Sequence, residues 1–196
     1  MHFFPYLERG MTLAEETDFP GAIANGAWSL ANVYNQTGQT DDAVRISKRA
    51  WNFAEPGGFL YFGGLALLQL ARGYSLNRDF EPAVSTVAHA LSLAKKGEFR
   101  ALEAQANFMR GEILMCVPES DLTDARTAYH AATSLAKKLE MRPLTAHSHA
   151  GLGRLHHFTG KKTQAKKELI RACEMYRDLG MTYYLQKAEQ DLASLA

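Results

Sequence analysis

The segment LALLQLARGYSLNRDFEPAVSTVAHALSL, which spans Leu65 to Leu93, decides the fold of this chain. In its first half, Leu70, Ala71 and Tyr74 share one face of a helix. Its second half carries small or β-branched residues at helical steps of four and three, at Ala83, Val87 and Ala90. Polar residues separate the two halves and form a tight turn. The segment therefore predicts a helical hairpin whose two helices approach each other closely.

The same hairpin recurs along almost the whole chain. Small residues of the first helix fall at Ala31, Ala71, Gly111 and Gly153, at steps of 40, 40 and 42 residues. Those of the second helix fall at Ala43, Ala83, Ala125 and Ala165 and, seven residues later each time, at Ala50, Ala90, Ala132 and Ala172. The step of 42 falls at the same place in every series, which predicts a two-residue insertion in the turn around residues 118–122.

Proline and capping residues divide the chain at the same places. Because proline disrupts a helix interior, it marks boundaries: Pro5 opens the first helix, Pro20, Pro56 and Pro143 fall between hairpins, and Pro82 and Pro118 fall at the turns within them. Left-handed residues that end a helix are expected at Gly38, Asn77 and Gly160. Side-chain oxygens that begin the next helix are expected from Thr40, Asp41, Asp79 and Asp121.

These signals predict an all-α fold, a right-handed α-solenoid of antiparallel helix pairs, in a single domain over residues 1–196. The predicted parts are a partial repeat at 1–19, four helix-pair repeats at 20–57, 58–97, 98–141 and 142–180, and a capping helix at 181–196. Helices are expected near 5–16, 20–36, 40–54, 58–76, 80–95, 98–116, 121–139, 143–158, 162–178 and 181–195. In the last of them Gln186, Lys187, Gln190 and Asp191 are expected to face away from the core.

The N-terminal edge lacks a partner helix in this scheme. Residues 6–10 resemble the second helix of a hairpin, yet no first helix precedes them. Apolar area is therefore expected to be exposed at Phe3, Phe4, Leu7, Met11 and Leu13. We expect either that the chain is the C-terminal piece of a longer solenoid, which we favour, or that this edge pairs with a second copy as a homodimer.

Composition limits the classes of partner. With 46% hydrophobic and 22% charged residues the chain can bury a core, and its net charge of +1 without a long basic block argues against nucleic acid. No apolar run approaches the ~20 residues that span a bilayer, so no membrane partner is expected. Two cysteines, Cys116 and Cys173, do not make a disulfide framework, and we expect both as buried thiols. Without a leader-like N-terminus, the chain is expected to be cytoplasmic.

No pattern of catalytic or cofactor-binding residues is present, so we expect no enzyme activity and no cofactor. Residues 160–163 (GKKT) lack the upstream glycine and the Ser or Thr after the first lysine that a phosphate-binding loop requires. Four histidines gather at His147, His149, His156 and His157. None of their pairs has the i,i+3 or i,i+4 spacing that would bring two ligands together on a helix, so no metal site is expected.

The repeated residues resemble the tetratricopeptide repeat family, in which a large–small pair and an aromatic residue mark the first helix and two alanines mark the second. The pairs Leu30-Ala31 and Leu70-Ala71, followed by Tyr34 and Tyr74, match that pattern. The usual repeat has ~34 residues and this one has 40 or more, nearly one extra turn per helix. Such long repeats are similar to the C-terminal helical arrays of bacterial signalling and regulatory proteins.

The resemblance implies that first helices line a concave groove that binds a protein or peptide. The implied contact residues are Asn25, Trp28, Asn32, Asn35, Arg72, Gln105, Phe108, Glu112, His147, Arg154 and His157. The asparagines share a helix face and can pair with a peptide backbone, unless they form a merely solvated face. Trp28 and Phe108 are expected either as anchors or as core residues. The expected function is a non-enzymatic peptide-binding scaffold; the alternative is a ligand-sensing regulatory module of a larger signalling ATPase, cyclase or transcription regulator.

Overall fold

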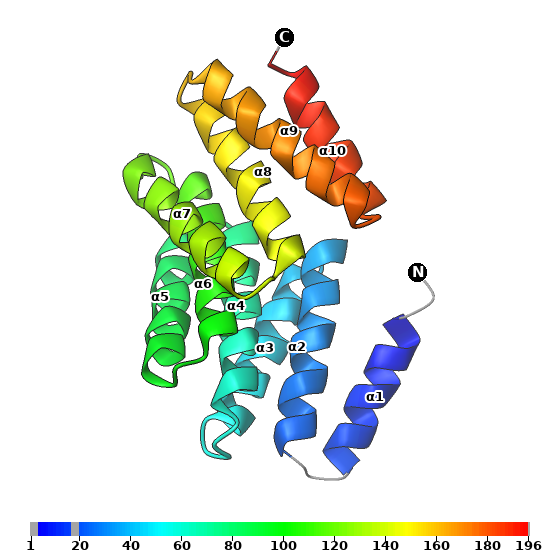
Figure 1. Ribbon diagram of the computed structural model, residues 1–196. Coiled ribbons are helices and arrows are strands. Elements are labelled where there is room, and N and C mark those ends of the chain that lie inside the picture. The colour runs from blue at the N-terminus through cyan, green and yellow to red at the C-terminus, as the bar shows by residue number, and fades with distance from the viewer. Residues whose placement is uncertain (1–3, 17–19, 196) are drawn as a thin grey trace. The chain divides into compact units, whose positions relative to one another are not determined.

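A computed structural model gives the structure of the protein and describes residues 4–16 and 20–195. Within those residues every regular element is an α-helix and no strand occurs. The helices, labelled in Figure 1, are α1 (Phe4–Glu16), α2 (Pro20–Thr37), α3 (Thr40–Ala54), α4 (Leu60–Leu76), α5 (Phe80–Lys96), α6 (Arg100–Cys116), α7 (Leu122–Lys138), α8 (Arg142–Phe158), α9 (Lys162–Asp178) and α10 (Thr182–Ala193). The all-α fold class is confirmed.

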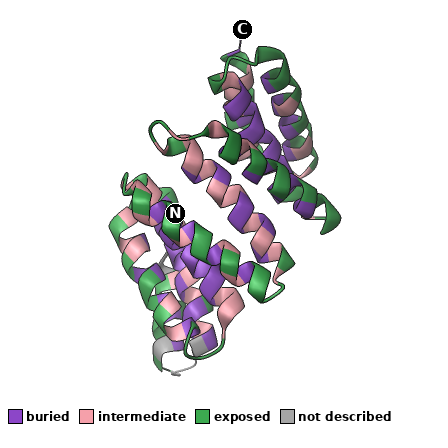
Figure 2. Cartoon of the chain, turned by 90° about the vertical axis from the view of Figure 1, so that its left-hand side faces the viewer, coloured by how far each residue is buried: buried purple, intermediate pink, exposed green. Residues whose placement is uncertain are grey.

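The chain divides into two compact units, residues 1–109 and 110–196, with the boundary inside α6. In the first unit α2 packs against α1, α3 and α4, and α4 packs against α3 and α5. In the second unit α8 packs between α7 and α9, and α10 packs against α9. Residues facing these neighbours are buried, as the purple segments of Figure 2 show. The grouping of the helices into one domain of four repeats stays a prediction.

The observed helix boundaries lie within two residues of those predicted from periodicity. Three-residue turns at 77–79, 97–99, 139–141, 159–161 and 179–181 join most of the later helices. The turn between α6 and α7, residues 117–121, has five residues, and this is the two-residue insertion that the repeat spacing predicted. The insertion is therefore accommodated in a turn and leaves both helices at their regular length.

The small residues of the repeat lie where helices touch. Ala31, Ala71, Ala83 and the equivalent alanines of the other repeats are completely buried, and the equivalent glycines are buried as well. A Cβ atom added at Gly153 would lie 2.6 Å from Leu169 Cγ, so this glycine permits α8 and α9 to pack closely. Because interiors are packed as densely as organic crystals, such a position accepts no larger side chain without movement.

Left-handed residues end the helices as expected at two positions and differently at a third. Gly38 and Gly160 have φ values of 82° and 72°. The prediction for Asn77 is wrong, since Asn77 keeps helical geometry and the next residue, Arg78, has φ 64°. In this turn Asp79 N donates to Tyr74 O at 2.9 Å, which is the hydrogen bond of a Schellman motif. That bond offsets the ~1–2 kcal/mol that a left-handed non-glycine residue costs.

Only one of the four expected capping side chains caps a helix in the expected way. Asp121 accepts a hydrogen bond from Thr123 N at 2.8 Å, and this bond lowers the pKa of the Asp121 carboxyl. Asp79 stands at the start of α5 without a side-chain cap bond. The other two, Thr40 and Asp41, pair with the following hairpin instead, because Asn77 donates to Asp41 at 2.8 Å and its side-chain carbonyl oxygen pairs with the Thr40 hydroxyl.

Helix α1 covers part of its apolar face against α2. Met11 is only 5% exposed and belongs to a core cluster with Ile23 and Ala27, so its predicted exposure is wrong. Leu7 packs partly against the same cluster, and Leu13 is exposed as predicted. Phe3 and the side chain of Phe4 lie outside the described residues.

Two further sequence expectations concern the cysteines and the membrane. Cys173 is buried, which raises the pKa of its thiol, whereas Cys116 at the end of α6 is exposed. The buried-thiol prediction is therefore wrong for Cys116. Of the helices that the structure describes, none combines the length and apolar character needed to cross a membrane.

Candidate functional site

Three polar residues of the second unit gather around the guanidinium group of Arg154, and we call the four residues together the Arg154 cluster: Glu112, Tyr129, Arg154 and Asp191. Arg154 Nη2 donates to Glu112 Oε1 at 2.8 Å. The Tyr129 hydroxyl donates to the same oxygen at 2.5 Å. On the other side, Arg154 Nη1 lies 3.7 Å from Asp191 Oδ2. The guanidinium is therefore held between carboxylates from α6 and α10.

Two glycines make room for the tyrosine that fixes this cluster. Tyr129 on α7 is 1% exposed, and its ring lies against Gly111 of α6 and Gly151 of α8. A Cβ atom at Gly151 would stand 2.4 Å from Tyr129 Cε1 and 3.1 Å from Glu112 Oε1. The small-residue pattern of the sequence thus has a local consequence, since it places a buried hydroxyl directly on the Glu112 carboxylate.

The charges of the cluster support one another. Burial raises the pKa of Tyr129, and the neighbouring Glu112 carboxylate raises it further. Burial by itself would lower the pKa of Arg154, but the charges of the Glu112 and Asp191 carboxylates outweigh it and raise the pKa above its usual value. Tyr129 therefore remains a hydrogen-bond donor and Arg154 remains a cation at physiological pH.

An aromatic cluster lies at the start of α8. His147 Nδ1 and the Tyr176 hydroxyl are 2.7 Å apart, and the rings of Tyr176 and Tyr184 stack with centroids 5.7 Å apart. The His147 ring meets Tyr184 edge-on, with centroids 4.6 Å apart. Burial raises the pKa of Tyr176, so its hydroxyl stays protonated. These contacts fix the orientation of His147.

A hollow of about 280 Å³ adjoins the Arg154 cluster. Its lining residues are Met115, Arg154, His157, Phe158, Leu169 and Asp191. Phe158 is 73% exposed, which is unusual for a large apolar side chain. His157 Nδ1 lies 3.4 Å from the Ser194 hydroxyl. The hollow thus combines an exposed aromatic ring with a guanidinium and a carboxylate that are already oriented.

The structure brings together part of the predicted groove. Glu112 and Arg154, which were predicted only as separate groove residues, form an ion pair. His157 lines the hollow beside Arg154, and His147 lies on the same helix. Sequence reasoning missed Tyr129 and Phe158. It also placed Asp191 wrongly: this residue was expected to face away from the core, but its carboxylate points to Arg154.

In the first unit, Asn35 has a structural role. It is 4% exposed, and its Nδ2 donates to the backbone oxygen of Gln69 at 2.9 Å and to Gln69 Oε1 at 3.2 Å. These bonds join α2 to α4 and leave Asn35 inaccessible to a ligand, so we withdraw it from the candidate site. Asn32 is partly exposed and accepts a hydrogen bond from Gln36 at 3.2 Å.

The other first-unit residues remain accessible to different extents. Asn25 is exposed, whereas Trp28, Arg72, Gln105 and Phe108 are partly exposed. Neither aromatic residue is fully buried, and neither projects freely into solvent. Their role in binding stays a prediction.

The remaining histidines of α8 are packed inside the second unit. His149 Nδ1 lies 2.5 Å from Glu168 Oε2 on α9, and this hydrogen bond lowers the pKa of Glu168. His156 is 8% exposed, and its burial lowers its pKa. Throughout residues 4–16 and 20–195, no group of three or more His, Cys, Asp or Glu side chains is arranged to hold a metal ion.

Comparison with known proteins agrees with this architecture. Residues 146–179, which cover most of α8 and α9, match the family model of the tetratricopeptide repeat. BtubC from P. vanneervenii superposes with a TM-score of 0.71 at 15% identity, over 98% of this chain and 86% of that one. The apo form of RapI superposes with a TM-score of 0.70 at 13% identity, over 99% and 84%.

A putative kinesin light chain of P. anserina with nearly identical TPR-like repeats gives a TM-score of 0.64 at 14% identity, over 91% of this chain and 96% of that one. No curated protein matches the chain by sequence. Folds of this type are typically non-catalytic and generally serve protein interactions. The chain carries a tetratricopeptide repeat in α8 and α9 and has the fold of the tetratricopeptide-like repeat proteins.

Proposed function

We propose that this chain is a non-enzymatic scaffold that binds a peptide or protein segment, and that its second unit does so beside the Arg154 cluster. The observation that carries this proposal is the pairing of an oriented polar cluster with an apolar hollow. Arg154 is fixed between Glu112 and Asp191, and Phe158 stands 73% exposed at the edge of the adjoining hollow. Binding energy in interfaces concentrates on such anchor positions.

The polar groups of the site indicate what the segment would carry. The side chains of Glu112 and Asp191 are each 35% exposed, so both carboxylates can accept hydrogen bonds from a ligand. The hollow beside Phe158 and Met115 suits an apolar side chain. A segment with an apolar side chain next to backbone N–H groups would satisfy both features. Because the tyrosine and the guanidinium are already in place, little ordering would accompany binding.

In the first unit, the family register implies a separate set of contact residues. Asn25, Trp28, Asn32, Arg72, Gln105 and Phe108 are the proposed contact residues there. Amide side chains offer both a donor and an acceptor and can pair with an extended backbone at ~0.5–1.5 kcal/mol per bond.

Selection from a displayed random-peptide library, followed by calorimetry of the enriched peptides, tests the proposal. Arg154→Ala and Phe158→Ala are each expected to weaken binding by about tenfold or more, as loss of ~1.4 kcal/mol at an anchor position would. Arg177→Ala is the matched control, because Arg177 is an exposed arginine of the same unit paired with Glu189 at 3.1 Å. The proposal fails if both site variants keep wild-type affinity for every enriched peptide, or if the control weakens binding equally.

Self-association through the N-terminal edge is a separate proposal. Tyr6 is 74% exposed and Leu13 is 52% exposed on α1, so apolar area remains there for a second copy. A mass in solution near twice 21.7 kDa that returns to one copy in a Tyr6→Ser, Leu13→Ser variant would support the homodimer. A single-copy mass at high concentration would contradict it.

A further inference from the structure

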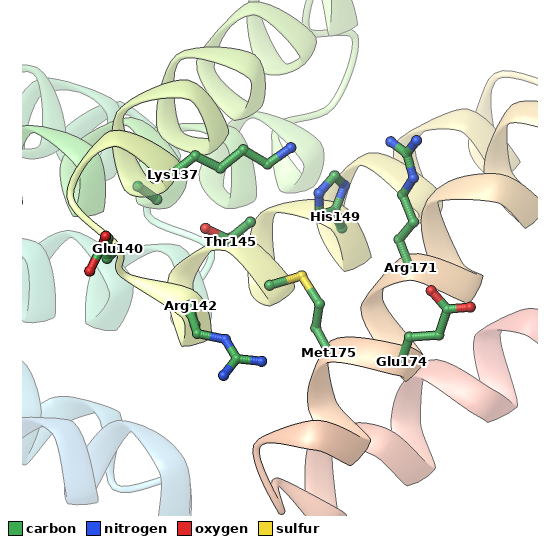
Figure 3. A pocket seen from close by; sticks show the side chains of 9 residues that line it. Lys137, Glu140, Arg142, Thr145, His149, Arg171, Glu174 and Met175 are labelled. Atoms are coloured by element: carbon green, nitrogen blue, oxygen red, sulfur yellow. The ribbon is translucent and has the colours of Figure 1, made fainter.

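A second hollow of the same unit lies on another face of α8. It has a volume of about 620 Å³, and the end of α7, the start of α8 and the middle of α9 line it (Figure 3). Arg142, Thr145 and His149 are its α8 residues. At about 100° per residue, each of them projects at least roughly 120° around the helix from Arg154. This hollow is therefore distinct from the surface beside the Arg154 cluster.

A shallower hollow of about 450 Å³ adjoins it along α9. Thr163, Lys166, Lys167 and Ile170 line this part, and Arg171 and Glu174 line both hollows. The two hollows therefore form one continuous surface. We call it the α9 track and define it by its cations and its central apolar residue: Lys137, Arg142, Lys166, Lys167, Ile170 and Arg171.

Positive charge gathers on the α9 track although the whole chain has a net charge of only +1. Its five cations face two lining carboxylates, Glu140 and Glu174. Among the ion pairs of the described residues, Arg142 is the single track cation that takes part, at 3.8 Å from Asp178 Oδ2. Even with Asp178 counted, the track keeps a surplus of positive charge. The exposed Ile170 adds an apolar contact at its centre.

A third carboxylate of α9 is turned away from this surface. The side chain of Glu168 is 17% exposed and bonds to His149, whose side chain is 6% exposed. Since Glu168 stands between Lys167 and Arg171 in sequence, its inward position leaves those two cations facing solvent. His149 lines the larger hollow itself, and its bond holds the Glu168 carboxylate largely away from solvent.

We propose that the α9 track binds an acidic peptide segment of a partner protein, with carboxylates of the segment on Lys137, Lys167 and Arg171 and an apolar side chain on Ile170. Two adjoining hollows suit an extended segment better than one compact anion. Glu140 and Glu174 argue against nucleic acid, because a duplex carries a phosphate charge every ~1.7 Å and would meet both carboxylates. An acidic peptide can place uncharged side chains beside them.

The probe is a fluorescein-labelled peptide of about ten residues, roughly 33 Å long when extended, with alternating glutamate and alanine and one central leucine. Fluorescence anisotropy at low salt is expected to show binding by the wild-type chain. The double variant Lys167→Glu, Arg171→Glu should weaken it by about tenfold or more, since close reversed charges now repel. Replacing glutamate by glutamine in the peptide should have a similar effect.

Lys95→Glu, Lys96→Glu in α5 is the matched control, because it makes the same charge change at two exposed lysines of another helix. It should change the affinity by less than about twofold. Lys167→Gln, Arg171→Gln provides a milder second variant, and circular dichroism checks that each variant is folded. Arg154→Ala should leave this affinity unchanged, which separates the test from that of the proposed function.

Three results would overturn the proposal. The first is absence of binding by the wild-type chain at millimolar peptide. The second is an equal loss of affinity in the Lys95, Lys96 control, which would indicate attraction to net charge alone. The third is displacement of the peptide by an equimolar single-stranded oligonucleotide with the same dependence on Lys167 and Arg171, which would indicate a nucleic-acid surface.

Discussion

Replacing Tyr129 by phenylalanine should destabilise the second unit by about 1.5 kcal/mol. The change keeps the ring between Gly111 and Gly151 and removes only the hydroxyl that donates to Glu112 at 2.5 Å. A hydrogen bond to a charged group contributes ~1.5–3 kcal/mol. The Glu112 side chain is 35% exposed and keeps its bond to Arg154, so water can replace part of the loss, and the lower end of that range applies.

Urea unfolding followed by circular dichroism measures this change. Both tryptophans, Trp28 and Trp51, lie in the first unit, so fluorescence reports that unit separately. Tyr183→Phe is the control, because this tyrosine is 59% exposed and its loss should change stability by less than ~0.5 kcal/mol.

A double-mutant cycle between Tyr129→Phe and Glu112→Gln isolates the interaction itself. The coupling energy should exceed ~0.5 kcal/mol, because the two residues share one partly buried hydrogen bond. A Tyr129→Phe variant as stable as the wild type, with no coupling to Glu112, would show that this hydroxyl does not orient the cluster.

Three further changes give distinct expected results. Asp121→Ala should lower the free energy of unfolding by ~1 kcal/mol, because it removes the cap bond to Thr123. Asp79→Ala should lower it by less, because Asp79 makes no such bond at the start of α5. Urea titration of the two variants measures the difference. Gly151→Ala should cost about 1–3 kcal/mol by overpacking against the buried Tyr129 ring, and thermal unfolding will show it. Burial lowers the pKa of His156, and the positive charge of Lys161 lowers it further. The folded state therefore binds fewer protons than the unfolded state, so the free energy of unfolding should fall as pH drops below ~6.5. The urea midpoint of a His156→Gln variant should depend less on pH.

The helices were predictable because their signal is repeated. Each apolar face recurs four times, so a misleading residue in one repeat is outweighed by the other three. The insertion at 117–121 shifts all later repeat positions by the same two residues, which makes it recognisable. The left-handed turn residues were harder to predict. Arg78, Glu98, Glu119 and Glu140 adopt positive φ although no local preference favours it, because the turn hydrogen bonds and the packing of the flanking helices determine the backbone there.

The candidate site was only partly predictable, for a related reason. Family register identified Glu112 and Arg154 because both lie on first helices. Tyr129 belongs to a second helix and reaches Glu112 only because Gly111 and Gly151 leave space for its ring. Sequence periodicity describes which face a residue occupies on its own helix, and it contains no information on which side chain a neighbouring helix brings to that face.

Asn35 shows the opposite failure. Its spacing from the other asparagines suggested a polar face, but the close approach of α4 buries its amide against Gln69. Asp191 was misplaced in the same way, because the apolar stripe of α10 suggested only which residues pack and gave no sign of the cation on α8. Both errors come from contacts between helices.

Site-specific photo-crosslinking tests the central claim, that the second unit binds a peptide beside the Arg154 cluster, most directly. Benzoylphenylalanine would replace Phe158 in one variant and His130, an exposed residue of α7, in a control. After irradiation with a library-selected peptide, we expect a peptide adduct at position 158 that Arg154→Ala abolishes, and none at position 130. Equal adducts at both positions, or an adduct at 158 that persists without Arg154, would contradict it.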